Sequence, residues 1–261
     1  PHLQTSQHMP YQFPRLPLLS IQSFSFFRKV KKVSKIIYSK YCYELCGFSR
    51  STAPLKLTLS YPMKKLLITG SHGYIGRLFL KKCVQHPSSF ACIIALDIRM
   101  PEADEKLSGV TYVEEDIRSE NISKIIAKYQ IDTVVHLAAI ISITGANSAL
   151  FEYDVDVNGS INLIHACINN GVKTFIHSSS GAAYGYWPSN IENILTEDMP
   201  MLGNIDIPYS HHKYLVEEKL KQVRIDYPEM EQFVFRVGTI LGKTTNNPIT
   251  EFLKKPKLLC L

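Results

Sequence analysis

Three glycines in the stretch Gly70-Ser-His-Gly73-Tyr-Ile-Gly76 have a spacing that suits a phosphate-binding loop. Glycine at these positions lets the chain turn tightly and lets backbone N–H groups approach phosphate oxygens. The helix expected to begin at Tyr74 would add a partial positive charge at its first turn, which also favours an anion. The spacing therefore predicts a pyrophosphate site, formed by the three glycines together with Tyr74 and Ile75.

An acidic residue stands where the ribose of a dinucleotide would need one. Asp97 ends an apolar run 21 residues after Gly76, a distance at which a carboxylate can accept hydrogen bonds from the ribose hydroxyls. A carboxylate repels a 2′-phosphate, so we expect NAD rather than NADP, and we interpret Arg99 as a solvated loop residue. Asp116 and the backbone N–H of Ile117 are expected to hold the adenine edge, although Asp116 could also cap the following helix.

The elements that must position these residues alternate between strand and helix. Apolar runs typical of buried parallel strands lie at residues 64–70, 90–97, 110–116, 132–139, 173–180 and 231–238. Apolar residues at helical spacing predict helices at 74–86, 119–130, 149–171 and 209–223. This alternation predicts an α/β fold, a doubly wound parallel sheet of the Rossmann type with right-handed crossovers.

Five motifs, in order along the chain, resemble those of the extended short-chain dehydrogenase/reductases, in the NAD-dependent epimerase/dehydratase family. They are TGSHGYIG (69–76), HLAA (136–139), SSSGAAYG (178–185), YSHHK (209–213) and RVGTILG (236–242). The resemblance covers residues 63 to about 242. The part from AAYG to YSHHK looks most like a sugar-nucleotide 4-epimerase-like subgroup. The resemblance implies an enzyme that binds NAD and acts on a small molecule.

The resemblance also assigns roles to individual side chains. Tyr209 and Lys213 fill the family's Y-x-x-x-K motif, and their spacing places them on one helical face. The lysine is expected to lower the pKa of the tyrosine, the general base, and to hold the nicotinamide ribose. Ser180 matches the hydroxyl that binds the reacting substrate oxygen, whereas His211 and His212 are interpreted as surface residues facing away from the pair. Further cofactor contacts are expected from Leu137, Ala138, Ala139 and Ser178.

Two departures from the family pattern near the catalytic residues bear on the expected reaction. Gly181 and Ala182 stand where the family's dehydratases carry an acidic pair, so 4,6-dehydration of a sugar is not expected. Asp156 replaces the asparagine of the family motif N-V-x-G-T, which removes an amide donor. We interpret His136, in HLAA, as a packed strand residue rather than a catalytic one.

Composition and cysteine usage restrict the class of protein further. The chain has 261 residues, 45% of them hydrophobic and 20% charged, which indicates a globular domain of substantial size. Apart from Cys42 and Cys46 the six cysteines are scattered, which suits reduced thiols in a cytoplasmic protein, and no metal site is expected. No run of eighteen apolar residues occurs, so we expect no membrane span.

Residues 1–62 differ in charge from the rest of the chain. They hold nine Lys or Arg and one acid, so they carry +8, and because the whole chain carries +6, residues 63–261 carry −2. The main domain therefore offers no basic surface for nucleic acid. We interpret residues 1–62 as a disordered basic extension of upstream or added origin, with a transit peptide or a binding arm as alternatives. Residues 63–261 are expected to form an NAD(P)-binding Rossmann domain whose C-terminal substrate domain is largely missing.

The leading hypothesis is an NAD-dependent epimerase or dehydrogenase that acts on a secondary alcohol. The resemblance makes a nucleotide sugar the expected substrate. Two alternatives stay open, namely an NAD(P)H-dependent reductase of a non-sugar carbonyl and a non-catalytic dinucleotide-binding protein. The substrate itself, and whether the protein is a homodimer, are left open by the sequence.

Overall fold

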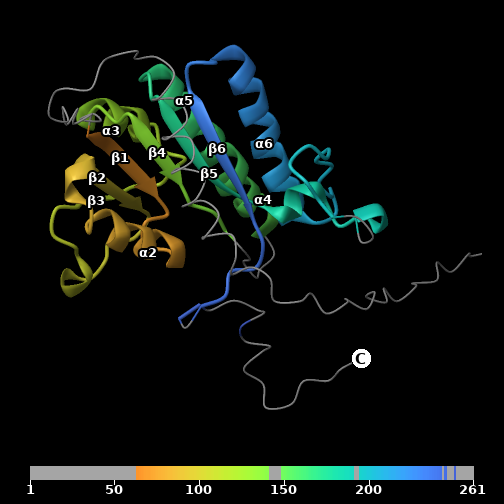
Figure 1. Ribbon diagram of the computed structural model, residues 1–261, viewed down its shortest axis with the longest axis horizontal. Coiled ribbons are helices and arrows are strands. Elements are labelled where there is room, and N and C mark those ends of the chain that lie inside the picture. Colours follow the sequence, from red (N-terminus) through yellow and green to blue (C-terminus); the bar gives the residue numbers. More distant parts are fainter. Residues whose placement is uncertain (1–62, 141–147, 191–193, 243, 246–249, 251–261) are drawn as a thin grey trace, which may run out of the picture. The chain divides into compact units, whose positions relative to one another are not determined.

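The computed structural model describes residues 63–140, 148–190, 194–242, 244–245 and 250, so the proposed basic extension 1–62 lies outside the described residues. Within the described part, six parallel strands form one sheet in the order β3-β2-β1-β4-β5-β6 (Figure 1). The strands are β1 Lys64–Thr69, β2 Phe90–Asp97, β3 Thr111–Glu114, β4 Thr133–His136, β5 Thr174–Ser180 and β6 Glu231–Val237. The chain moves outward from β1 to β3 and returns to the other side of β1, which creates a crevice at the carboxyl ends of the strands.

Helices connect most of the parallel strands in the described part of the chain, whereas β2 and β3 are joined by a loop with a short 3-10 turn, Ala103–Glu105. The helices are α2 Tyr74–Cys83, α3 Asn121–Tyr129, α4 Ser148–Tyr153, α5 Ser160–Asn169 and α6 Pro208–Asp226. A π-helical segment, Asp154–Gly159, joins α4 to α5. The sequence predicted one helix over 149–171, and the structure instead contains α4, the π-helical segment and α5. Gly171 lies just beyond α5 with a φ of +67°, which explains why the helix stops there.

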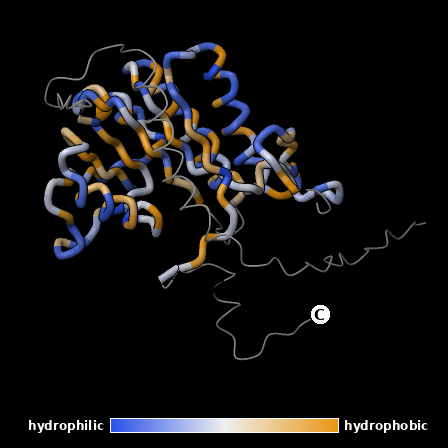
Figure 2. The backbone as a smooth tube through the Cα atoms, in the orientation of Figure 1, coloured by the Kyte–Doolittle hydropathy of each residue, from blue (hydrophilic) through white to orange (hydrophobic). Residues whose placement is uncertain are grey.

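Two apolar cores hold the helices against opposite faces of the sheet. On one face, α2 contributes Leu80 and Cys83, which pack with Leu66 and Ile68 of β1. On the other face, buried residues of α3, α5 and α6 pack against β1, β2, β4 and β5. Figure 2 shows hydrophobic residues along the central strands and mainly hydrophilic ones along α6. Helices on both faces of a parallel sheet confirm the doubly wound fold that the apolar runs predicted.

None of the helices in the described residues is long and apolar enough to cross a membrane. The longest of them, α6, runs over 19 residues and carries charged side chains along its length. Its first turn lies beside the carboxyl end of β5, where residues Gly181–Tyr184 form a short 3-10 turn. This arrangement places Tyr209 near the strand end that carries Ser178 and Ser180.

Candidate cofactor site and active site

A pocket of about 280 Å³ lies at the carboxyl ends of β1, β2 and β4, and we call it the glycine-loop pocket. It is the place where the topology reverses direction, as expected for a ligand site in this class of sheet. Much of the predicted cofactor set lines it: Gly70, Gly73, Asp97, Asp116, Ile117, Leu137, Ala138 and Ala139.

The loop after β1 lies so close to the end of β4 that only glycine fits at its first position. Gly70 has a φ of +69°, and a Cβ there would lie 2.5 Å from the backbone nitrogen of Ala138. A Cβ on Gly76 would collide with the carbonyl oxygen of Gly70 and with Ser71. The loop therefore presents bare backbone at the start of α2, which fits the pyrophosphate of a dinucleotide.

Asp97 and Asp116 both line this pocket, and each already makes contacts within the protein. Asp97 Oδ2 accepts a hydrogen bond of 2.9 Å from the backbone N–H of His72, so this carboxylate braces the glycine loop. Asp116 accepts from the guanidinium of Arg118, with Nη2 at 2.7 Å, and this hydrogen bond lowers the pKa of Asp116. Asp116 Oδ1 also accepts a hydrogen bond of 2.9 Å from the backbone N–H of Arg118, in the turn before α3, and Ser119 Oγ accepts from the first residue of α3. The role of Asp116 at the adenine edge stays a prediction.

The three proposed catalytic side chains come together where α6 meets the end of β5. Lys213 Nζ donates a hydrogen bond of 3.1 Å to the carbonyl oxygen of Ser178 and lies 5.7 Å from the ring centroid of Tyr209. The Ser180 side chain interacts with the Tyr209 phenol and acts to lower its pKa. Ser180 Oγ also accepts from the backbone N–H of Ala182 at 3.1 Å, so the turn after β5 fixes this hydroxyl.

The electrostatics of this group differ from the expectation drawn from the sequence. Burial raises the pKa of Tyr209, the hydrogen bond with Ser180 lowers it, and the negative charge of Asp156 raises it further. Burial also lowers the pKa of Lys213, and Asp156 and Glu217 act against that shift. The expectation that Lys213 brings the pKa of Tyr209 below its usual value is therefore wrong for this structure, because desolvation of the phenol outweighs the other influences.

His136 is a packed strand residue, as the sequence indicated. Its Nδ1 lies 2.7 Å from Thr69 Oγ1 and its Nε2 lies 2.8 Å from Ser160 Oγ. Burial lowers its pKa to about 3, so the ring is neutral at physiological pH. The ring of His177 stacks on it with centroids 5.3 Å apart, and its own pKa is also lowered by burial and by the charge of Lys213.

The interpretation of His212 as a surface residue is wrong. Its side chain is 5% exposed, and its Nδ1 lies 3.4 Å from Oδ2 of Asp156, whose side chain is 4% exposed. His212 turns inward because α6 packs against the π-helical segment, which carries Asp156. Asp156 Oδ1 meanwhile accepts from the backbone N–H of Ile140 at 2.8 Å. Asp156 therefore offers an acceptor where the family asparagine would offer an amide donor. The backbone N–H of Ile140 donates to it, and the His212 ring lies beside it.

The sequence analysis did not predict a hydrogen-bond network that lies behind the catalytic group. Glu217, on the same face of α6 and four residues after Lys213, accepts from Arg236 of β6, with Nη2 at 2.8 Å. It also accepts a short hydrogen bond from Ser179 Oγ. Arg236 Nη1 donates to the hydroxyl of Tyr184 at 2.6 Å. The sequence did contain a sign of this network. Glu217 follows Lys213 by four residues, as Lys213 follows Tyr209, so all three lie on one face of the helix.

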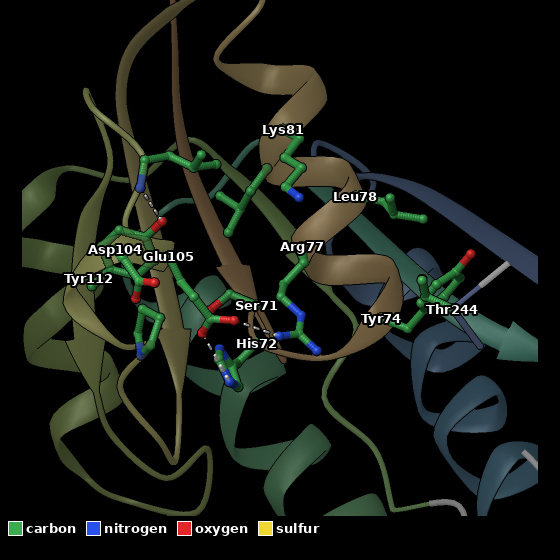
Figure 3. Close-up of a pocket in the computed structure, with 13 residues that line it drawn as sticks. Ser71, His72, Tyr74, Arg77, Leu78, Lys81, Asp104, Glu105, Tyr112 and Thr244 are labelled. Carbon is green, nitrogen blue, oxygen red and sulfur yellow. Dashed lines mark hydrogen bonds and ion pairs between the residues drawn. The ribbon is translucent and has the colours of Figure 1, made fainter. Parts of the chain in front are cut away.

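Six predicted cofactor residues do not line the glycine-loop pocket, namely Tyr74, Ile75, Gly76, Ser178, Tyr209 and Lys213. The Tyr74 side chain turns to a second pocket of about 480 Å³ beside α2. Figure 3 shows Arg77 of α2 on one side of this second pocket and Glu105 on the other, joined by an ion pair of 3.3 Å. His72 Nε2 also lies 4.0 Å from Glu105. Contacts of Tyr74 and Ile75 with a cofactor stay a prediction.

Within the described residues, no three His, Cys, Asp or Glu side chains gather in a way that could hold a metal ion. For the whole chain, the expectation that it has no metal site stays a prediction.

Comparison with known proteins gives a consistent answer. The model of the NAD dependent epimerase/dehydratase family matches residues 66–255. An uncharacterized epimerase/dehydratase of Staphylococcus epidermidis is 31% identical over 121 residues, which are 46% of this chain and 38% of that protein.

Solved structures agree with this match. The UDP-glucose 4-epimerase of Thermotoga maritima is 26% identical with a TM-score of 0.54, over 66% of this chain and 54% of that one. The UDP-Glc/GlcNAc 4-epimerase of Campylobacter jejuni is 26% identical with a TM-score of 0.57, over 66% and 53%. This chain thus spans about half the length of these neighbours. With a family model matched over most of its length, the chain belongs to the NAD-dependent epimerase/dehydratase family, whose members are enzymes that use NAD.

Proposed function

We propose that this protein is a nucleotide-sugar epimerase or dehydrogenase in which Tyr209, Lys213 and Ser180 handle the proton of a secondary alcohol. The observation that carries the proposal is the buried ammonium group of Lys213 beside the Tyr209 ring, with the Ser180 side chain interacting with the same phenol. A general acid or base has to be within hydrogen-bond reach of the substrate oxygen, and these two hydroxyls define one such position.

Each of the three side chains has a separate role in the proposed reaction. Ser180 donates a hydrogen bond to the substrate oxygen and so orients it toward Tyr209. The Tyr209 phenolate accepts the alcohol proton in the oxidation, and the phenol returns a proton to the carbonyl oxygen in the reduction. Lys213 places a positive charge near the phenolate and is held in position by the carbonyl oxygen of Ser178. NAD, when bound, supplies the acceptor and donor of the hydride.

The glycine-loop pocket supplies the groups that would hold this cofactor. Gly70 and Gly73 offer backbone to the pyrophosphate, and Ala138 and Ala139 let a flat ring lie close to the chain. Asp97, which lines the same pocket, would meet the ribose hydroxyls, and its carboxylate would favour NAD over NADP.

A nucleotide sugar as substrate is supported by the likeness to the two UDP-sugar 4-epimerases. Gly181 and Ala182 lie in the turn directly after Ser180, and neither carries a group that could transfer a proton for the elimination of water. This favours epimerisation or simple oxidation over dehydration. An epimerase ends each turnover with its cofactor unchanged, so NAD retained through purification would favour it, whereas freely exchanging NAD(H) would favour a reductase of other carbonyls.

The decisive variant is Tyr209→Phe, which removes the proton acceptor and keeps the packed ring. We expect turnover to fall about 10²–10⁴-fold, while NAD affinity, measured by fluorescence titration, stays close to that of the wild type. The assay is turnover of a panel of UDP-sugars and simple ketones. Tyr227→Phe, at the exposed far end of α6, is the matched control and should keep full activity. Wild-type turnover in Tyr209→Phe would refute the assignment.

A further inference from the structure

Ser210, the residue after Tyr209, is a buried serine whose hydroxyl bonds outside its own helix. It is 0% exposed. Its Oγ donates a hydrogen bond of 2.6 Å to the carbonyl oxygen of Ala182 and accepts one of 3.0 Å from the backbone N–H of Asn204. A hydroxyl group can donate one hydrogen bond and can also accept, and Ser210 uses both capacities. Ser210 therefore joins three segments, namely the first turn of α6, the turn after β5 and the loop before α6.

The residue whose carbonyl Ser210 binds also holds Ser180. The backbone N–H of Ala182 donates to Ser180 Oγ at 3.1 Å. Ala182 thus binds Ser180 through its N–H and Ser210 through its carbonyl oxygen, so two hydrogen bonds connect the end of β5 with α6. The Ser180 side chain in turn interacts with the Tyr209 phenol. This link therefore connects the two side chains that are proposed to handle the proton.

Helical geometry carries the constraint from Ser210 to Tyr209. Both residues lie in the first turn of α6, and consecutive residues of an α-helix are rotated by about 100° around its axis. A fixed Ser210 therefore leaves Tyr209 little freedom to change direction. The residue at the N-cap position is Ile207, whose aliphatic side chain cannot accept from the first N–H groups of the helix. The contact of Ser210 with Ala182 thus holds a helix end that has no help from its own cap residue.

We propose that Ser210 is a positioning residue, which sets the direction of Tyr209 relative to Ser180 through the backbone of Ala182. The inference rests on the proposed function, because it concerns the two hydroxyls that handle the proton there. Ser210→Ala should leave the turn after β5 intact, since the backbone N–H of Gly185 also donates to the Ala182 carbonyl, at 2.9 Å. What the substitution removes is the bond that fixes this turn to α6.

The first test measures hydrogen exchange of the Ala182 amide by NMR in the full chain, because this amide donates to Ser180 Oγ. We expect Ser210→Ala to speed its exchange about tenfold and to change the Ile176 amide, in the middle of β5, much less. Ser210→Cys, whose thiol is a weaker donor and acceptor, should give an intermediate rate. An unchanged Ala182 rate, or an equal rise at Ile176, would overturn the proposal. The measurement needs no turnover, so its failure is separate from failure of the Tyr209→Phe assay.

The second test separates kcat from KM and from cofactor affinity. Ser210→Ala should lower kcat about 10- to 100-fold, because misplaced catalytic groups transfer the proton poorly. KM for the UDP-sugar that the wild type turns over fastest, and the Kd of NAD, should stay close to the wild-type values. The reason is that Ser180, Ala182 and Ser210 do not line the glycine-loop pocket. Unchanged kcat, or a loss of NAD affinity as large as the loss of kcat, would contradict the proposal.

Two further variants distinguish positioning from a general loss of structure. In the Tyr209→Phe background, Ser210→Ala should lower kcat much less than in the wild type, since the side chain that it positions no longer carries the proton. Ser123→Ala is the matched control, because Ser123 is a half-buried helix serine whose Oγ accepts from Asn170 away from the site. It should leave kcat and the exchange of the Ala182 amide in place. An equal loss of kcat in both backgrounds, or the same loss in Ser123→Ala, would refute a positioning role.

Discussion

Gly70 meets two constraints, one from its own backbone and one from the neighbouring strand end. Its φ of +69° lies in the left-handed region, and a Cβ would press on Ala138. Gly171 shares the first constraint, with a φ of +67°, but a Cβ there would meet nothing within 4 Å. Comparing substitutions at the two glycines therefore separates two energetic costs of adding a Cβ, namely the cost of a left-handed backbone and the cost of steric crowding.

Replacing each glycine by alanine tests this difference. Gly171→Ala should lower the free energy of unfolding by about 1–2 kcal/mol, the cost of a left-handed L-residue. Gly70→Ala should cost more, and it should also weaken NAD binding, because the loop has to move away from Ala138. Urea unfolding and NAD titration measure the two effects. Equal destabilisation by both substitutions, with NAD affinity intact, would show that the close approach is unimportant.

Residue types and spacing were sufficient to predict which side chains gather at the proposed catalytic site. They were not sufficient to predict the pKa shifts of these side chains. Ser180, Tyr209 and Lys213 come together because a motif fixes them on one strand end and one helical turn. The direction of the Tyr209 pKa depends on how deeply the phenol is buried, and burial depends on packing partners that lie far away in the sequence. The burial of His212 likewise involves a partner far away in the sequence, since Asp156 is 56 residues away.

The contact between α6 and β6 includes an ion pair whose acidic partner is buried, together with a hydrogen bond from Arg224 to Gln232. The side chain of Glu217 is 3% exposed and receives hydrogen bonds from the Nε and Nη2 atoms of Arg236. In the sheet, β5 lies between β4 and β6. By holding β6 to α6, this pair also helps to fix the neighbouring β5, which carries Ser180. Removing one partner of such a pair leaves the other charge buried without compensation.

Arg236→Met should therefore lower the free energy of unfolding by about 3–5 kcal/mol. The double variant Arg236→Met with Glu217→Leu should recover most of that loss, because no unpaired charge is then buried. Chemical denaturation of the wild type and of both variants measures the two effects. A double variant no more stable than Arg236→Met would mean that packing of the aliphatic parts, and not charge, holds α6 to β6.

At the level of elements, the sequence predicted each of the six strands in the described residues, in their order along the chain, and it predicted their ends to within a few residues. Apolar runs are a reliable signal here because a parallel sheet covered on both faces needs them. The long helix was predicted as continuous because the spacing of apolar residues does not change abruptly at the π-helical segment. The wider turn of the π-helical segment is set by packing against α6. Such a contact between distant parts of the chain cannot be predicted from the local sequence.

Over the whole molecule, two buried neutral histidines make stability depend on pH. The pKa of His136 is lowered from 6.5 to about 3 in the folded state, and that of His177 is lowered as well. Between these pH values the unfolded chain binds protons that the folded protein does not, so the free energy of unfolding falls as the pH falls.

His136→Gln should reduce this dependence, since glutamine can still bond to Thr69 and Ser160 but does not titrate. We expect a smaller decrease in the free energy of unfolding between pH 6.5 and pH 3 than in the wild type, with His177 accounting for part of the remaining slope. Denaturation curves recorded at several pH values provide the measurement. His86→Gln, at an exposed position, is the control and should follow the wild type. An identical slope in His136→Gln would contradict the assignment.

The π-helical segment Asp154–Gly159 has a consequence for how this site tolerates insertion and deletion. A π-turn holds one residue more than the α-helical turn it replaces, so deleting a single residue there could restore a regular helix without unfolding it. Every residue on one side of the deletion would then rotate by about 100° relative to the other side. Asp156 would leave His212 while the helix, the sheet and the glycine loop stayed in place. The number of residues in this helix, as much as their identity, keeps the carboxylate facing α6.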